Sequence, residues 1–345
     1  MSVAGRLRRC CSYVRLALSI GVAAGALAWG SVTVTAQAHT GRRPRARASV
    51  VGGGNVQISR FPFQVALYNP AAGSPMAGFF CGGVIVDATH VITAAHCLAG
   101  GGHGRGGVSG EVAVLAGSTR LDRPDAGSVR DPAASVSVDP YYNPYTNDYD
   151  IGVVALAHPL WAGSTAPSAN GANAIAPLPI DVAGAADYGE ATSAPTTLAT
   201  VSGWGDTNPA PSGSPRYPSA LRASSVPLVG ESLCQEEYAA IEQSITPRML
   251  CAGSSRPRAD SCYGDSGGPL VVDRDSPARP PADYVLVGLV DFGNGCAQPG
   301  FAGVYTRIAD PAIARFLASD VAHRAKVSVH RSGRKRKRKR HRAHR

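Results

Sequence analysis

The sequence has few aromatic residues, no Cys-x-x-Cys pair, and no long apolar segment after its first 38 residues. Aromatic residues make up 6 % of the 345 positions, while 40 Gly and 26 Pro residues punctuate the chain. So many Gly and Pro residues argue against a long helical bundle, and an apolar content of 44 % argues against wholesale disorder. Glycine, proline or charge interrupts every later apolar run, so we expect no later segment to cross a bilayer.

Positive charge is also scarce in the body of the chain, although the formal net charge is +10. Ten of the 34 Lys and Arg residues lie within residues 331–345, and eight lie within residues 1–49. Residues 50–330 therefore hold 16 basic residues against 24 acidic ones, a balance of −8. A nucleic-acid-binding fold would carry basic residues on its body, so the charge distribution disfavours this class.

The two basic ends have the character of processing and tail segments. Four arginines precede an apolar run that starts at Leu16, and Ala36-Gln37-Ala38 is a small-x-small cleavage site. This pattern predicts a signal peptide over residues 1–38, with an uncleaved anchor as the alternative, and then a pro-segment over residues 39–49. Residues 327–345 are expected to form a disordered basic tail, because their like charges repel one another. We therefore expect a secreted protein, whose tail could bind a polyanion or an anionic surface.

Export would leave six cysteines, since Cys10 and Cys11 leave with the signal. An even number of cysteines in an oxidising compartment indicates disulfides, and spacing alone leaves all fifteen pairings open. The lack of a Cys-x-x-Cys pair disfavours the competing zinc site. We expect neither a metal nor a cofactor. The six are Cys81, Cys97, Cys234, Cys251, Cys262 and Cys296.

The body of the chain has the pattern of an all-β protein. Short runs rich in Val, Leu and Ile alternate with Gly, Pro, Asn and Asp, as in barrels and sandwiches. One helix is predicted, with Asp310 as its N-cap and Pro311 in its first turn. The predicted strands are Phe63–Leu67, Gly83–Val86, Val112–Leu115, Ile151–Leu156, Thr200–Ser202, Leu270–Val272 and Tyr284–Val290.

Three segments carry residues suited to nucleophilic catalysis. His96 stands among small residues in TAAHC, where the imidazole has room to face a cleft. Asp150 stands at the mouth of an apolar strand, where its burial requires a donor such as an imidazole N–H, while Asp148 is interpreted as a turn residue. Ser266 lies in DSCYGDSGGPL, whose glycines allow backbone N–H groups to approach a developing oxyanion. Each residue taken alone also fits a structural role.

Together these segments resemble the trypsin/chymotrypsin-like family of serine endopeptidases, nearest to its trypsin branch. The motifs TAAHC, DIGVVAL, SGWG, GDSGGPL and GVYTRI occur in the family's order between about residue 50 and residue 322. The resemblance implies an all-β fold of two antiparallel six-stranded β-barrels with a C-terminal helix and the active site between them. It places the protease domain at 50–326, with the barrel boundary near residues 160–195. It also implies a monomer that acts on protein or peptide substrates.

The resemblance implies roles for individual residues. His96 is the general base, Asp150 orients and stabilises its imidazolium, and Ser266 is the nucleophile. The N–H groups of Gly264 and Ser266 form the oxyanion hole. Its implied disulfides are Cys81–Cys97, Cys234–Cys251 and Cys262–Cys296.

The trypsin branch also implies a pocket for a basic side chain. Asp260 is then the floor that receives Arg or Lys, and Gly293 and Gly303 are side-chain-free walls. A surface-turn role for Asp260 is the alternative. A polyanion-binding protein with a protease-like scaffold, or a protease that prefers non-basic residues, also stays open.

Two features depart from the family pattern. Activation in the family frees an apolar N-terminus, which implies that the ammonium of Val50 pairs with Asp265. Ser49 precedes Val50, so maturation requires a protease that cuts after Ser49, or later trimming. Asp291 stands where the family usually has Ser close to the triad Asp. Two carboxylates there repel, so one takes up a proton or the imidazolium is over-stabilised.

Overall fold

The computed structural model describes residues 52–99, 111–162, 174–178, 180–186, 197–207, 216–255, 258–274 and 283–321. The predicted signal peptide, pro-segment and basic tail lie outside the described residues, and so does Val50. Among the helices within the described ranges, none is long and apolar enough to span a membrane.

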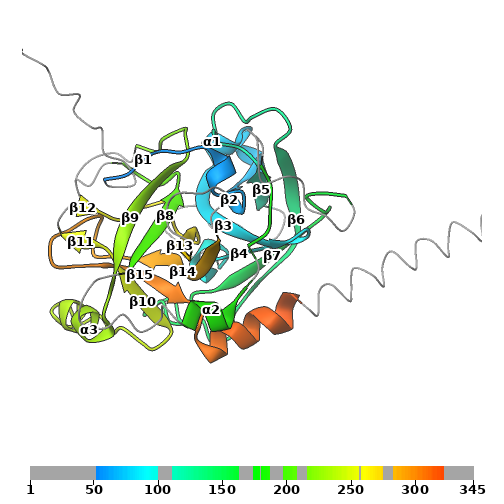
Figure 1. Cartoon of the computed structure of the whole chain (residues 1–345). Helices are drawn as coiled ribbons and strands as arrows, with labels where there is room; N and C mark the ends of the chain where they lie inside the picture. The colour runs from blue at the N-terminus through cyan, green and yellow to red at the C-terminus, as the bar shows by residue number, and fades with distance from the viewer. Residues whose placement is uncertain are drawn as a thin grey trace, which may run out of the picture. The chain divides into compact units, whose positions relative to one another are not determined.

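Six antiparallel strands close into a first barrel in the N-terminal part of the described chain (Figure 1). Val84, Ile92 and Val153 lie opposite one another on three adjacent strands and enter one core cluster. The adjoining residues Ile85, Val91 and Val154 turn instead into a second cluster, because side chains alternate between the faces of a strand. In hydrogen-bonded order the strands are β2 (Gln64–Tyr68), β3 (Phe79–Asp87), β4 (His90–Thr93), β7 (Gly152–Leu156), β6 (Val129–Val138) and β5 (Ala113–Ala116), which pairs back with β2.

A second antiparallel barrel follows the first in the sequence, so the predicted fold of two six-stranded barrels is confirmed. The boundary falls between β7 and the first strand of this barrel. A short strand, β1 (Gly54–Asn55), extends its sheet, and β11 (Ser254–Ser255) and β12 (Arg258–Ala259) form a separate ladder. The barrel strands are β8 (Leu198–Gly203), β9 (Arg222–Val229), β10 (Met249–Ala252), β15 (Gly303–Arg307), β14 (Tyr284–Phe292) and β13 (Pro269–Asp273), which pairs back with β8.

The predicted helix after Asp310 is present over 311–321. The Asp310 carboxylate accepts the Ala312 N–H at 2.8 Å, which is the expected N-cap bond. The expectation of a single helix was wrong, because α3 (Glu231–Ala239) also forms. Its N-cap is Gly230, and only Cys234 and Tyr238 are buried, so it lacks both a capping side chain and an apolar stripe. Single helical turns are α1 (Pro75–Gly78), α2 (Val182–Ala186), η1 (Ile58–Arg60), η2 (Pro70–Ala72) and η3 (Ala95–Cys97).

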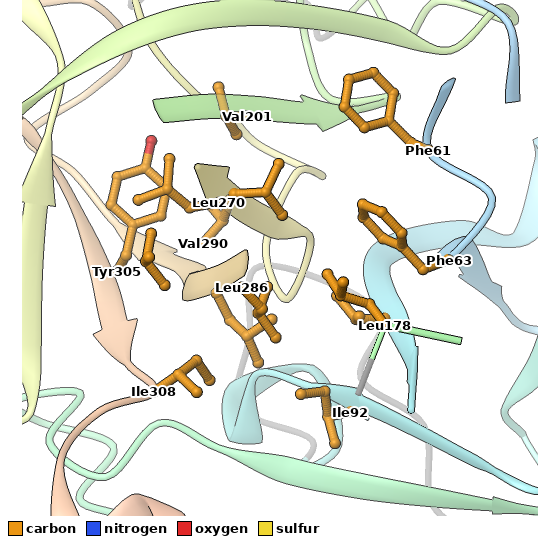
Figure 2. Close-up of a cluster of buried hydrophobic side chains, with 14 of the residues drawn as sticks. Phe61, Phe63, Ile92, Leu178, Val201, Leu270, Leu286, Val290, Tyr305 and Ile308 are labelled. Carbon is orange, nitrogen blue, oxygen red and sulfur yellow. The ribbon is translucent and has the colours of Figure 1, made fainter. Parts of the chain in front are cut away.

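The two barrels share one core cluster (Figure 2). Phe63 and Ile92 from the first barrel enter the same cluster as Val201 and Leu270 from the second. Leu178, from the segment that connects the barrels, joins them there. A close-packed shared core resists displacement of one barrel against the other, and so it fixes the loops at the barrel ends.

Three disulfides tie the loops to this framework. They contain all six cysteines expected after export, so none of these cysteines is a free thiolate for zinc. Bonds that close loops of this kind typically stabilise a domain by about 2–4 kcal/mol each. The pairs are those that the resemblance implies: Cys81–Cys97, Cys234–Cys251 and Cys262–Cys296.

Candidate active site

His96 and Asp150 meet because the strands beside them are neighbours. His96 lies in η3 directly after β4, and Asp150 lies just before β7, and these strands pair with Thr93 opposite Gly152. The Asp150 carboxylate accepts the His96 backbone N–H at 2.8 Å and lies 2.7 Å from the imidazole Nδ1. Two contacts to one residue fix the carboxylate against one edge of the ring.

Asp150 is buried and His96 is partly buried, and the electrostatics of the pair favour an anion beside an imidazolium. Burial raises the pKa of Asp150, but the charge of His96 and the hydrogen bonds to the carboxylate outweigh burial and hold this pKa below its ordinary value. Burial lowers the pKa of His96, but the charge and hydrogen bond of Asp150 outweigh it, so this pKa is raised. The imidazole is therefore suited to accept a proton.

The second barrel holds the main chain around Asp150. Thr306 in β15 donates its hydroxyl to the Asp150 carbonyl at 2.7 Å. Just upstream, Asn147 and Tyr149 have φ of 55° and 59°, in the left-handed region that disfavours non-glycine residues. Such conformations cost about 1–3 kcal/mol each and persist only where the surroundings hold them.

A polar clamp from the second barrel holds this strained segment. Arg248 donates to the Asp148 carboxylate from Nε at 2.7 Å and from Nη2 at 2.8 Å, and Thr246 donates its hydroxyl at 2.8 Å. The Arg248 guanidinium also lies over the Tyr149 ring, 4.6 Å from its centroid. Interpreting Asp148 as a turn residue missed this clamp, because Arg248 lies 100 residues further along the chain.

Ser266 lies in a tight loop that packs against the first barrel. Its carbonyl accepts the Gly82 N–H from β3 at 2.8 Å. Gly267 has φ of 73°, and a Cβ there would collide with the Thr93 hydroxyl, so the loop requires glycine at this position. The close approach places Ser266 beside the strand end that leads into His96.

Asp265, next to Ser266, is fully buried beneath the loop. Its carboxylate accepts the N–H of Gly205 at 2.8 Å and that of Cys262 at 3.0 Å. A Cβ on Gly203 or on Gly205 would strike this carboxylate, which explains both glycines of the SGWG motif. Burial nevertheless raises the pKa of Asp265 to about 7.

A cavity of ≈ 310 Å³ brings the predicted residues together. Asp260 is 5 % exposed, and Oδ2 accepts the Ala297 N–H at 2.8 Å. Its Oδ1 has no hydrogen-bond partner among the described residues, and burial raises the pKa of Asp260 to about 7. A Cβ on Gly303 would lie 2.6 Å from that oxygen, so glycine keeps it accessible. Among the predicted catalytic, oxyanion-hole and substrate-binding residues, Asp150 does not line the cavity, and those that do are His96, Asp260, Gly264, Ser266, Gly293 and Gly303.

The donor groups around Ser266 are not engaged with the rest of the described chain. Neither the Gly264 N–H nor the Ser266 N–H donates a hydrogen bond to another described residue. The described contacts also include no hydrogen bond between the Ser266 hydroxyl and His96, as is common before substrate binds. Sequence reasoning missed Tyr142, which also lines the cavity and which no motif marks.

Two groups of side chains near the cavity have the composition of metal ligands. In the first, Cys81 and Cys97 are joined in a disulfide, so neither offers a thiolate. In the second, His96 is combined with Asp150 and Asp291, and its Nδ1 already faces the Asp150 carboxylate.

The chain resembles known proteases over most of its length. The Trypsin family model matches residues 50–314. A trypsin from Saccharopolyspora erythraea is 32 % identical over 260 residues, which cover 75 % of this chain and 93 % of that protein. Trypsin 5G1 from Aedes aegypti is 34 % identical over 266 residues, covering 77 % of this chain and 83 % of the relative. Transmembrane protease serine 9 from Rattus norvegicus is 32 % identical over 283 residues, covering 79 % of this chain but only 22 % of the relative.

Replacing Arg248 by leucine tests the clamp, because Arg248 does not line the cavity. We expect the free energy of unfolding in urea to fall by about 1–2 kcal/mol, the scale of charge-assisted hydrogen bonds to partly exposed groups. We also expect the pKa of His96 to fall in an NMR titration, because Asp150 raises it and loses its fixed position.

The matched control is Arg120→Leu, which removes an exposed ion pair between Arg120 and Asp122. This variant should leave the His96 pKa where it was. An unchanged His96 pKa in Arg248→Leu would show that the clamp does not position Asp150.

Proposed function

The chain belongs to the trypsin family of serine endopeptidases, and from that premise we propose that it cleaves peptide bonds after Arg and Lys through an acyl-enzyme on Ser266. The observation that carries the proposal is the position of Asp260. Its nearly buried carboxylate, with one oxygen free of hydrogen bonds to described residues, lines the same cavity as His96 and Ser266. A cation in the cavity would supply the missing partner.

The proposed chemistry begins with proton transfer. His96 takes the proton of the Ser266 hydroxyl as Oγ attacks the scissile carbonyl, and Asp150 stabilises the imidazolium that forms. The unengaged N–H groups of Gly264 and Ser266 then donate to the oxyanion, and each such donor is typically worth about 3–4 kcal/mol. His96 returns the proton to the leaving amine, and water then cleaves the acyl-enzyme by the same steps.

The proposed activation gives Asp265 a cationic partner. An α-ammonium on Val50 beside the buried carboxylate would hold Asp265 ionised, against the burial that raises its pKa to about 7. An ammonium two residues further out, on Ala48, would not reach it. Release after Ser49, or trimming to Val50, is therefore the proposed maturation step.

We further propose that the protein is secreted. Three disulfides support this, because such bonds persist in oxidising compartments. The ten basic residues within 331–345 support a contact between the tail and a polyanion or an anionic surface. The proposed substrates are proteins and peptides with Arg or Lys at the cleavage site, and the proposed enzyme is a monomer.

The proposal is tested with matched short chromogenic peptides ending in Arg, Lys, Phe or Ala and protein engineered to begin at Val50. We expect cleavage after Arg and Lys only, and a loss of at least about 10³-fold in kcat/KM in Ser266→Ala. Folded protein that cleaves none of the four peptides would refute the enzymatic proposal. Preferred cleavage after Phe or Ala would refute the pocket assignment alone.

The pKa of Asp260 predicts how the preference for basic residues depends on pH. Below about pH 7 the free pocket carries a neutral carboxyl, and above it an anion. The ratio of kcat/KM for the Arg peptide to that for the Phe peptide should therefore fall as pH falls through 7, and His96 cancels from this ratio. In Asp260→Asn the ratio should be flat with pH and about 10²–10⁴-fold lower, the scale of a broken buried ion pair. A steep ratio in the variant would contradict the assignment.

The proposed pairing of the Val50 ammonium with Asp265 is tested by comparing chains that begin at Val50 and at Ala48. We expect the Ala48 chain to be at least about 100-fold less active, since the buried Asp265 then lacks its ammonium. Asp265→Asn, beginning at Val50, should lose activity similarly. Full activity of the Ala48 chain would contradict the proposed pairing.

A further inference from the structure

Asp291, in β14, is a buried carboxyl beside the His96–Asp150 pair. Its exposed fraction is 5 %, and neither carboxylate oxygen has a hydrogen-bond partner of ordinary geometry among the described residues. One ligand atom each from His96, Asp150 and Asp291 lie within 4.8 Å of one another. Two ionised carboxylates at such a distance only accept hydrogen bonds, so neither can satisfy the other.

A proton on one of the two acids removes both the repulsion between the two carboxylates and the lack of a hydrogen-bond donor between them. It cancels one of two like charges in a buried site, and it turns an acceptor into a donor. The anion belongs on Asp150, which accepts the His96 N–H at 2.8 Å and faces Nδ1 at 2.7 Å. No described residue donates a hydrogen bond of ordinary geometry to the Asp291 carboxylate.

We propose that Asp291 is a neutral carboxylic acid that donates its O–H to the Asp150 carboxylate, and that it is thereby a positioning residue for the His96–Asp150 pair. The inference deepens the proposed function and rests on it for its consequence in catalysis. Asp291 acts through Asp150, which it holds toward the imidazole. At the position of Asp291 the family usually has a serine.

The surroundings of Asp291 favour the neutral form. Burial and the charge of Asp150 raise its pKa well above the ordinary value, and the side chain of Asn147 opposes them only in part. Asp148 adds further negative charge, although its carboxylate is paired with Arg248. The titratable and charged groups that face Asp291 or its two partners are His96 from η3, Tyr238 from α3, and Tyr142, Asp148 and Asp150 from the loop before β7.

The neutral form has a consequence for pH dependence that separates it from an ionised Asp291. A second anion beside Asp150 would stabilise the imidazolium and move the acid limb of kcat/KM to higher pH. A neutral Asp291 contributes no such charge. Replacing it with asparagine, which is also neutral and also a donor, should then leave the acid limb in place.

The direct test is infrared spectroscopy on Ser266→Ala protein at about pH 8.5, where Asp260 and Asp265, with pKa values of about 7, are ionised. We expect the carbonyl band of a protonated carboxylic acid, and we expect Asp291→Asn in the same background to lack it. A band that persists in the variant, or no band in the parent, would overturn the proposal. The infrared band does not depend on peptide hydrolysis, so a failure of this proposal can be distinguished from a failure of the proposed function.

The kinetic test compares Asp291→Ala with Asp291→Asn in active protein. Removing the donor should lower kcat by about 10-fold or more, and asparagine should restore most of this loss with an unshifted acid limb. An acid limb that moves to lower pH in Asp291→Asn would show an ionised Asp291 instead. Equal losses in the two variants would show a packing role without donation.

Discussion

A buried carboxylate that has to remain charged is the constraint on which the rest of this site depends. Asp150 is 1 % exposed, and it stays ionised because His96 contacts its carboxylate through both the main chain and the ring. Both barrels contribute to its position. The pairing of β4 with β7 supplies His96. From the second barrel, Thr306 donates to the Asp150 carbonyl and Arg248 binds the Asp148 carboxylate. The shared core between the barrels matters because these contacts cross from one barrel to the other.

Three further buried carboxyls, Asp260, Asp265 and Asp291, have no cationic partner among the described residues. Our proposals give Asp260 a substrate cation, Asp265 an N-terminal ammonium, and Asp291 a proton. Burial raises the pKa of Asp260 and of Asp265 to about 7. Without their counterparts, both groups bind protons more tightly in the folded chain than in the unfolded one, so their contribution to stability declines as pH rises from about 4 to 7. Binding and activation would therefore also stabilise the fold.

Sequence patterns predicted the regular parts of the fold and missed those whose signals are weak. Strands with continuous apolar runs, such as β7 and β14, were predicted, as was the helix capped by Asp310. The β6 strand, Val129–Val138, was missed because it contains Arg, Asp and Pro and is only partly buried. Helix α3 was missed because a glycine precedes it and only two of its side chains are buried. In both cases tertiary contacts, rather than local preference, decide the structure.

The sequence by itself determined the all-β pattern and the motifs whose resemblance to a known family implied the two-barrel fold and the candidates for the site. The glycines of these motifs have a physical reason in the close approaches that they allow. Gly203 and Gly205 have to be glycine because Asp265 lies against them, and Gly267 because Thr93 does. Only the tertiary structure decided which charges lack partners and which residues support Asp150. Arg248 reaches Asp148 across 100 residues, and Asp291 approaches Asp150 from a different barrel. Such pairings depend on how the barrels pack, and no local pattern in the sequence records that packing.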